Sequence, residues 1–401
     1  MTTDPQAQPL VTVRPQTLRT TLFVLLALIA ITAIQIGAPH WLGQEPGTID
    51  YKIFHYVGEL SRSGQPALPY DAPGFETWQA QQPGGEIFMP WTYPPQFGLF
   101  TELLSYLPVG IGYALFTGLS LAALIWALFR LAPTAAIPAL MLTLPATLMN
   151  IRAGQNGFLT ALLFALTLWL ALRPRPAAAG ATLGLLAYKP HLGLGLGLVA
   201  LFRGGAAMVI AAMVTLILTL GLATWAFGPE IWSAFLHSVR ESANFLHQGA
   251  YPMQRMTSAF ALAFSLGAPA ALALAAQALL ALTVLGLIVT ALLRRWQMPH
   301  LLALATIGGL GVSPYSYDYD LVALAPGLAL ALPAISAHTP GAARRLLVAA
   351  LLLATGWGLL TVVLSSPLNL SGIPALGALG YLVALALIAR ALFAAEAHTP
   401  A

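Results

Sequence analysis

Long apolar segments alternate with short polar stretches along most of the chain. The segments lie at residues 20–38, 109–129, 134–151, 157–172, 177–188, 192–202, 205–227, 268–293, 299–312, 321–335, 346–364 and 374–393. A run of roughly 18 or more apolar residues is long enough to cross a bilayer as a helix. The pattern therefore predicts an all-α polytopic membrane protein with about 10–12 transmembrane or half-membrane helices.

The composition supports a membrane protein. Of the 401 residues, 58% are hydrophobic and 7% are charged, and the mean hydropathy is +0.80. So few charges cannot cover a water-facing surface, which excludes a soluble enzyme, a nucleic-acid-binding protein and a disordered scaffold. The chain has no cysteine, which excludes disulfide bonds, thiolate metal sites and a cysteine nucleophile.

The segment 177–202 is ambiguous, because it can form one kinked span or two half-length helices that meet at Lys189. Each half would be about 17–20 Å long, shorter than the ~30 Å hydrocarbon layer. The positive-inside rule favours the pair, which places most arginines that follow it in the cytoplasm. All acidic residues except Asp4 and Glu396 then lie on the outer side.

The ends of the chain are predicted to be cytoplasmic. Residues 20–38 lack a small-residue cleavage site, so we expect a retained span and not a signal peptide. Arg14 and Arg19 precede this span. We therefore expect cytoplasmic tails at 1–19 and 395–401 around a single membrane domain at 20–394.

Two long polar segments, 39–108 and 228–267, are expected on the outer side. The first mixes proline, glycine, glutamine, aromatic and acidic residues and is too long for a plain connector. The second has apolar positions at helical spacing, namely Trp232, Phe235, Leu236, Val239, Ala243 and Leu246. Such a pattern is typical of a short helix in the plane of the interface.

Several polar residues in these regions suit chemistry at the membrane surface. Asp50 follows the first span, where it can be a helix cap or a general base. Arg152 opens an Arg-Ala-Gly-Gln-Asn-Gly loop, which can be a capped turn or an anion site. Lys189 lies between two apolar half-helices, where burying its ammonium is costly unless an anion accompanies it. This favours phosphate binding at Lys189.

The segment Ser313 to Asp320 places two acids and three tyrosines at the end of a short span. The acids Asp318 and Asp320 do not share one helical face, so cation binding, sugar recognition and helix capping all remain open. The histidines show no HExxH or similar ligand spacing, so no metal site is predicted.

Short motifs in a fixed order along residues 20–335 resemble glycosyltransferase family 87. They are Asp50 after the first span, Tyr93-Pro94-Pro95, Gly154-Gln155, Tyr188-Lys189-Pro190-His191, Phe227-Gly228-Pro229-Glu230-Ile231-Trp232, and Ser313-Pro314-Tyr315 leading to Tyr319-Asp320. In this chain His191 stands where the family more usually has glutamine, and Glu102 lies in a stretch that is commonly apolar.

The resemblance implies a GT-C type fold and a polyprenyl-phosphate-mannose-dependent α-mannosyltransferase-like enzyme. A mannose or related sugar would pass, with inversion, from a polyprenyl-phosphate donor to a lipid or glycan hydroxyl. The reaction would occur on the outer face of a bacterial cytoplasmic membrane, in cell-envelope glycolipid biosynthesis. No cofactor is expected, although a divalent metal is left open, and no nucleic acid is a partner.

The candidate residues follow from this resemblance and from the available charges. Asp50 is the expected catalytic base. The donor phosphate is expected on Lys189, Arg152 and Arg255, and the substrates on Tyr93, Gln155, His191, Tyr319, Asp320 and His247. A transporter or flippase of a lipid-linked sugar is the alternative. It should expose polar groups to both sides in alternation, whereas the acids here are assigned to one side.

Overall fold

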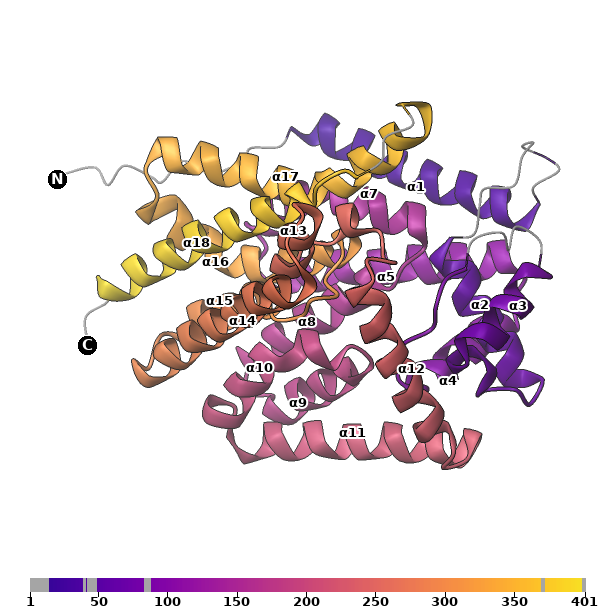
Figure 1. Cartoon of the computed structure of the whole chain (residues 1–401). Coiled ribbons are helices and arrows are strands. Elements are labelled where there is room, and N and C mark those ends of the chain that lie inside the picture. The colour runs from indigo at the N-terminus through magenta and orange to yellow at the C-terminus, as the bar shows by residue number, and fades with distance from the viewer. Residues whose placement is uncertain (1–13, 39–40, 42–48, 83–87, 369–371, 399–401) are drawn as a thin grey trace.

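The computed structural model describes residues 14–38, 41, 49–82, 88–368 and 372–398, and over these residues the chain is helical and contains no strand (Figure 1). In these ranges seven helices are long and apolar enough to cross a membrane, or eight if one bent pair is counted. The long ones are α1 (Pro15–Gly37), α5 (Val109–Leu131), α11 (Gly205–Phe227), α14 (Ala270–Leu293), η5 with α16 (Asp318–Ala323 and Leu324–His338), α17 (Gly341–Leu368) and α18 (Leu376–Ala397). The predicted all-α polytopic architecture is confirmed.

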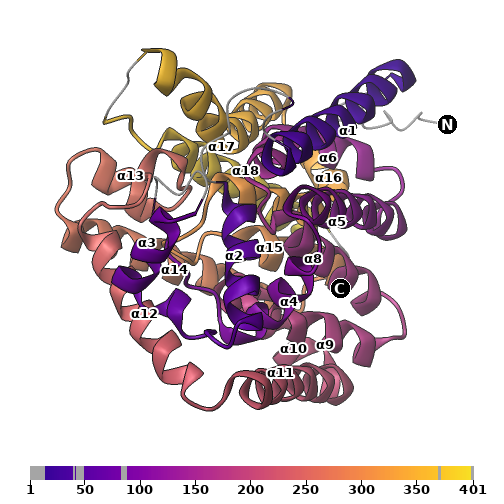
Figure 2. The ribbon, with the colours of Figure 1, turned by 90° about the vertical axis from the view of Figure 1, so that its right-hand side faces the viewer.

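Shorter helices complete the bundle. The apolar ones are α6 (Ala136–Leu142), α7 (Leu144–Ala153), α8 (Gly157–Ala171), α9 (Pro176–Leu185), η3 (Leu186–Tyr188), α10 (Pro190–Arg203), α13 (Ala259–Ser265) and α15 (Met298–Gly309). The others are α2 (Asp50–Arg62), η2 (Leu68–Tyr70), α3 (Ala72–Ala80), α4 (Pro95–Ser105), α12 (Ile231–His247) and η4 (Met253–Arg255). The helices α2, α3, α4 and α12 gather at one end of the bundle, which we call the loop end (Figures 1 and 2).

Large apolar side chains remain exposed on the long helices. Trp225 on α11 is 83% exposed, and Phe23 on α1 is 72% exposed. Only 11% of the apolar window of α11 is buried inside the protein. A contiguous apolar surface of this kind is stable when lipid covers it, so these faces are the bilayer-facing side of the bundle.

The ambiguous segment 177–202 forms two half-length helices that fold back on each other. Gly180 and Gly184 of α9 pack against Met208 and Ala212 of α11, so α9 and α11 run in the same direction. Since α10 joins the end of α9 to the start of α11, it returns against both. The chain therefore reverses direction at Lys189, as the predicted re-entrant pair requires. That the two half-helices enter and leave on the same side of the membrane remains a prediction.

The predicted span at 134–151 is bent by 65° between α6 and α7. The helix breaks at Thr143, and Pro145 lies in the first turn of α7. A proline has no backbone N–H for the preceding turn and its ring crowds that turn, which ends α6. The apolar segment 134–151 is therefore two short helices and not one straight span.

The end helices extend beyond the predicted boundaries. α1 begins at Pro15, inside the expected tail 1–19, because proline suits the first helical turn. α18 continues to Ala397, past residue 394. Glu396 is held there by the His300 Nδ1 at 2.5 Å and by the backbone N–H of Gln297 at 3.1 Å.

The contact of α9 with α11 provides a test of the returning pair. An added Cβ at Gly180 would overlap the carbonyl oxygen of Met208, whereas nothing lies within 4 Å of a Cβ at Gly221 on α11. We expect Gly180→Leu to lower the free energy of unfolding by about 1–3 kcal/mol, as overpacking does. Gly221→Leu, facing open space, should change it far less. Thermal unfolding in lipid nanodiscs measures both, and equal effects would contradict this packing.

Candidate active site

Asp50 is the first residue of α2, at the loop end of the bundle. Its position is fixed by the next turn, in which Tyr51 and Phe54 are buried. Their rings lie edge to face at 6.4 Å, and Tyr51 packs in the same way on Tyr113 of α5 at 5.6 Å. Asp50 therefore projects from an aromatic anchor and not from a loose loop.

Gln155 holds one oxygen of this carboxylate. Its Nε2 donates to Asp50 Oδ1 at 2.9 Å. Its Oε1 accepts from the Tyr93 hydroxyl at 3.0 Å and from the backbone N–H of Asn156 at 2.9 Å. The turn that presents Gln155 has a left-handed backbone at Gly154, with φ 65°, which glycine adopts most readily. Any larger residue would also clash, because a Cβ at this position would lie 2.5 Å from the Tyr51 Cβ.

Lys189 forms a buried ion pair with Asp320. Its Nζ lies 2.5 Å from Asp320 Oδ1, and the two side chains are 6% and 3% exposed. The other oxygen, Oδ2, accepts from the backbone N–H of Tyr317 at 3.3 Å. The turn between the half-helices thus places an ammonium inside the protein, where η5 supplies its counter-ion.

Arg255 forms a second ion pair with Asp318. Its Nε and Nη2 donate to the two carboxylate oxygens, each at 3.2 Å. The segments that carry them are joined by the backbone N–H of Thr257, which donates to the Ser316 carbonyl at 2.8 Å, and by an isolated bridge between Met256 and Tyr317. This short pairing brings Arg255 to the start of η5.

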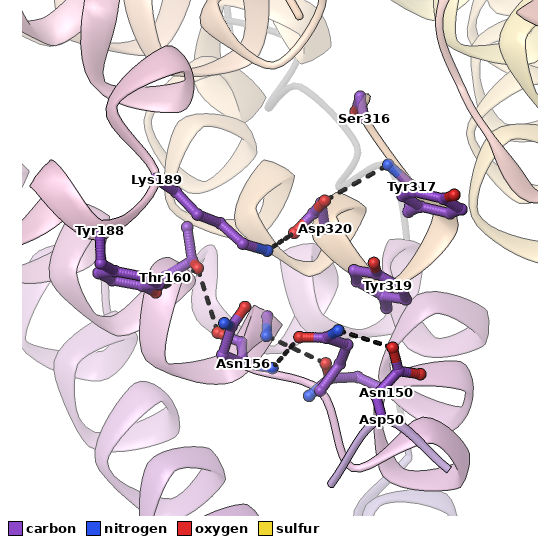
Figure 3. Close-up of polar contacts among 12 residues, drawn as sticks. Asp50, Asn150, Asn156, Thr160, Tyr188, Lys189, Ser316, Tyr317, Tyr319 and Asp320 are labelled. Atoms are coloured by element: carbon purple, nitrogen blue, oxygen red, sulfur yellow. Dashed lines mark hydrogen bonds and ion pairs between the residues drawn. The ribbon is translucent and has the colours of Figure 1, made fainter. Parts of the chain in front are cut away.

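Tyr319 lies between the two cations. The Lys189 Nζ is 5.4 Å from the centre of its ring, and the Arg255 guanidinium carbon is 5.6 Å from it. Figure 3 shows Tyr319 between Asp320 and Asp50, with Lys189 beyond Asp320. Three carboxylates and two cations therefore surround one tyrosine, which is 8% exposed.

Burial raises the pKa of Asp50 above its ordinary value of 3.8. Arg255, the hydrogen bond from Gln155 and Lys189 oppose this rise without cancelling it. Burial also raises the pKa of Tyr93, so its phenol stays protonated and donates to Gln155. Asp50 is thus a carboxylate with a strengthened affinity for a proton, which suits a general base.

The structure brings together most of the predicted site residues: Asp50, Tyr93, Gln155, Lys189, Arg255, Tyr319 and Asp320. His191 lies close enough to interact electrostatically with Lys189 and Asp320. Arg152 and His247 are exposed, on the last turns of α7 and α12, and no described contact joins them to this cluster. Their predicted roles remain predictions.

Asp318 was not among the predicted site residues, although it holds one of the two cations. Its spacing from Asp320 contained the signal: residues at i and i+2 of a tight helix point in different directions, so each acid can hold a different cation. The sequence showed that the two acids do not share a helical face but left open what each of them binds.

The described residues contain no cluster of three or more histidine, aspartate, glutamate or cysteine side chains arranged for a metal ion. A hollow of about 430 Å³ lies elsewhere, between the first turns of α1 and Leu144 and Leu148 of α7. It does not touch the charged cluster, so the chemistry is assigned from the cluster and not from the size of a cavity.

Comparison with known proteins identifies the family of this chain. The profile of glycosyltransferase family 87 matches residues 91–314, more than half of the chain. The crystal structure of ArnT from Cupriavidus metallidurans bound to undecaprenyl phosphate is similar to this chain with a TM-score of 0.41 and 14% identity, over 95% of this chain and 78% of that chain. Comparison with curated proteins finds no match.

The Lys189–Asp320 pair provides a stability test. We expect Lys189→Met to cost about 3–5 kcal/mol of unfolding free energy, because it leaves Asp320 buried without a counter-ion. The double variant Lys189→Met with Asp320→Leu should recover much of this loss, since it removes both charges. His237→Ala breaks a pair whose histidine is 63% exposed and should cost no more than about 1 kcal/mol. A double variant no more stable than Lys189→Met would contradict the pairing.

Proposed function

Because the chain belongs to glycosyltransferase family 87, we propose that it transfers a sugar from a polyprenyl-phosphate donor to a hydroxyl of a lipid or glycan acceptor. The proposed sugar is mannose or a related hexose or pentose. The proposed site is the charged cluster around Tyr319, with Asp50 as base. We further propose that the loop end faces the outer side of a bacterial cytoplasmic membrane and that both termini are cytoplasmic.

The observation that carries this proposal is the placement of one base opposite two cations. Asp50 Oδ1 is held by Gln155, and Oδ2 has no side-chain partner among the described residues, so it can accept the proton of an acceptor hydroxyl. Lys189 and Arg255 lie at Tyr319, where they can stabilise a departing phosphate. Inverting transfer needs a base and a leaving group on opposite faces of the sugar.

A phosphate leaving group explains why one carboxylate suffices. The second pKa of a phosphate monoester is about 6, so the departing group needs no protonating acid. It does develop a second negative charge, which fixed cations stabilise. The carboxyl pair of a glycosidase, which must protonate a sugar alkoxide, has no counterpart in this chemistry.

Both cations keep hydrogen-bond donors for the phosphate. Arg255 uses Nε and Nη2 on Asp318, and its Nη1 is not used in that pair. Lys189 donates to Asp320, and an ammonium has three donors in all. We propose that Asp318 and Asp320 orient the two cations, while their remaining donors bind the donor phosphate.

The polyprenyl chain of the donor requires a site in contact with lipid. The turn between the half-helices α9 and α10 supplies such a site, because it places Lys189 within the apolar bundle. A phosphate bound there would have its prenyl tail alongside helices that expose apolar side chains to the bilayer.

Asp50→Asn should slow sugar transfer strongly. Loss of the base lowers kcat about a hundredfold or more, while donor KM changes little because the phosphate-binding cations remain. The assay is release of polyprenyl phosphate from a polyprenyl-phosphate-mannose donor by the purified protein. The matched control is Glu76→Gln, an exposed acid on α3. A wild-type kcat in Asp50→Asn would show that Asp50 is not the catalytic base.

The rate should also depend on the protonation of Asp50. As the pH falls through its raised pKa, the carboxylate that acts as base is lost, so the acid limb of kcat should lie above 3.8. Gln155→Leu removes a hydrogen bond that favours the carboxylate and should move this limb to higher pH. Gln81→Leu, at an exposed position, should leave the limb in place. A limb that moves to lower pH in Gln155→Leu would contradict the assignment.

A further inference from the structure

The hollow of about 430 Å³ between α1 and α7 lies apart from the charged cluster. Cavities of roughly 300–1,000 Å³ are the usual size for binding a small organic ligand. The fold explains why this space exists. α1 packs on α5 and α7, α6 diverges from α7 by 65°, and the buried residues of α1 begin only at Leu25. The first two turns of α1 therefore stand beside the bundle without packing closely on it (Figure 1).

The lining of this hollow changes from polar to apolar along α1. The first two turns contribute side chains that can form hydrogen bonds, namely Gln16, Thr17, Thr20 and Thr21. The third turn contributes Val24 and Leu25, and Leu144 and Leu148 of α7 form the opposite wall. At 1.5 Å per residue, the polar and apolar ends are separated by about 13 Å along α1.

Two of the lining hydroxyls have no partner in the described part of the chain. A threonine in a helix commonly donates to a carbonyl of the preceding turn, as Thr283 of α14 does to Leu279 at 2.7 Å. Thr20 and Thr21 make no such hydrogen bond, and both border the hollow. Polar groups without partners in apolar surroundings cost free energy, so a ligand that accepts hydrogen bonds from these hydroxyls is favoured.

The bilayer supplies a molecule with this order of polarity. The hollow continues into the lipid-facing surface of α1, where Phe23 and Leu26 are exposed. A purely hydrocarbon chain, such as the prenyl tail of the proposed donor, would leave the threonine hydroxyls unpaired. A phospholipid can pair with them through its phosphate and ester oxygens, while an acyl chain packs between Val24 and Leu148.

Charge favours a phospholipid with an anionic headgroup. Arg14 precedes α1 and Arg19 lies in its second turn, and both side chains are exposed. The two walls lie within residues 14–38 and 103–229, which contain no aspartate or glutamate. Clustered arginines without neighbouring acids attract the anionic surface of a membrane. We propose that the hollow binds one anionic phospholipid, with its headgroup at residues 14–21 and one acyl chain against α7.

Such a lipid would join the first turns of α1 to the bundle. At its other end α1 is already held, because Gly37 packs closely on Gly110 of α5. A ligand that binds the folded protein stabilises it, so occupancy should raise the temperature of unfolding. The site is separate from the charged cluster, and the inference does not depend on the proposed sugar transfer.

The experiment measures lipid binding to the full-length, delipidated protein in detergent. Native mass spectrometry counts retained dioleoyl phosphatidylglycerol, with dioleoyl phosphatidylcholine as the zwitterionic reference. We expect one phosphatidylglycerol to be retained in preference. The double variant Thr20→Val with Thr21→Val keeps the shape of both side chains and should bind it about tenfold more weakly, the scale of two lost hydrogen bonds.

Two further variants separate hydroxyl from charge. Thr283→Val is the matched control, because that hydroxyl is already paired within α14, and it should bind phosphatidylglycerol as the wild type does. Arg14→Gln should reduce the preference for phosphatidylglycerol over phosphatidylcholine. Equal retention of the two lipids by the wild type, or unchanged binding in the double threonine variant, would overturn the proposal.

Photolabelling locates the bound lipid. A phosphatidylglycerol with a diazirine in one acyl chain should label residues 24–25 and 144–148, and Leu148→Trp, which fills the hollow, should lose this label. Competition by polyprenyl phosphate that is stronger than competition by unlabelled phosphatidylglycerol would assign the hollow to the donor tail. Cross-links between the α1 helices of two copies would assign it to a dimer. Either result contradicts a phospholipid site.

Discussion

The cost of placing charge inside an apolar bundle determines how this protein is built. Lys189 and Asp320 are almost inaccessible, and so is Asp318 beside Arg255. Neither cation could remain at its position without its acid, and neither acid without its cation. One short segment, Asp318-Tyr319-Asp320, supplies both acids and the ring between them. The turn between the half-helices α9 and α10 brings Lys189 to this segment. The bridge between Met256 and Tyr317 brings Arg255 to it.

Much of this architecture was predictable, because lipid imposes simple rules. Apolar length predicted the helices, and the asymmetry of arginine favoured the returning pair at Lys189. The bend at Thr143 was missed, since Pro145 lies within an otherwise apolar run, and a hydropathy pattern does not register a lost N–H. α18 continues to Ala397, past the end of the apolar pattern, and its last turn contacts His300, almost a hundred residues earlier in the chain.

The candidate site was predicted in part. Asp50, Lys189 and Asp320 were found because a charge or motif marked each of them, and they do lie in one cluster. The pairing itself was not predictable, since sequence alone does not say that Lys189 meets Asp320 while Arg255 meets Asp318. Gln155 shows the same limit. It was expected to contact substrate, but its two hydrogen-bonding ends are used on Asp50 and Tyr93. Arg152 lies exposed at the end of α7, and its predicted role in phosphate binding remains a prediction.

The separation of Lys189 from Asp320 has a consequence for biosynthesis. The two residues are 131 positions apart in the chain, so the ribosome delivers the ammonium to the membrane long before its counter-ion. A single transmembrane helix would have to carry that unpaired charge through the hydrocarbon layer during the delay. Two half-helices that return to the side they entered from leave the ammonium at the turn between them, and it has no counter-ion there until η5 is made. Insertion of the returning pair and completion of its buried ion pair are therefore two separate events in the synthesis of the protein.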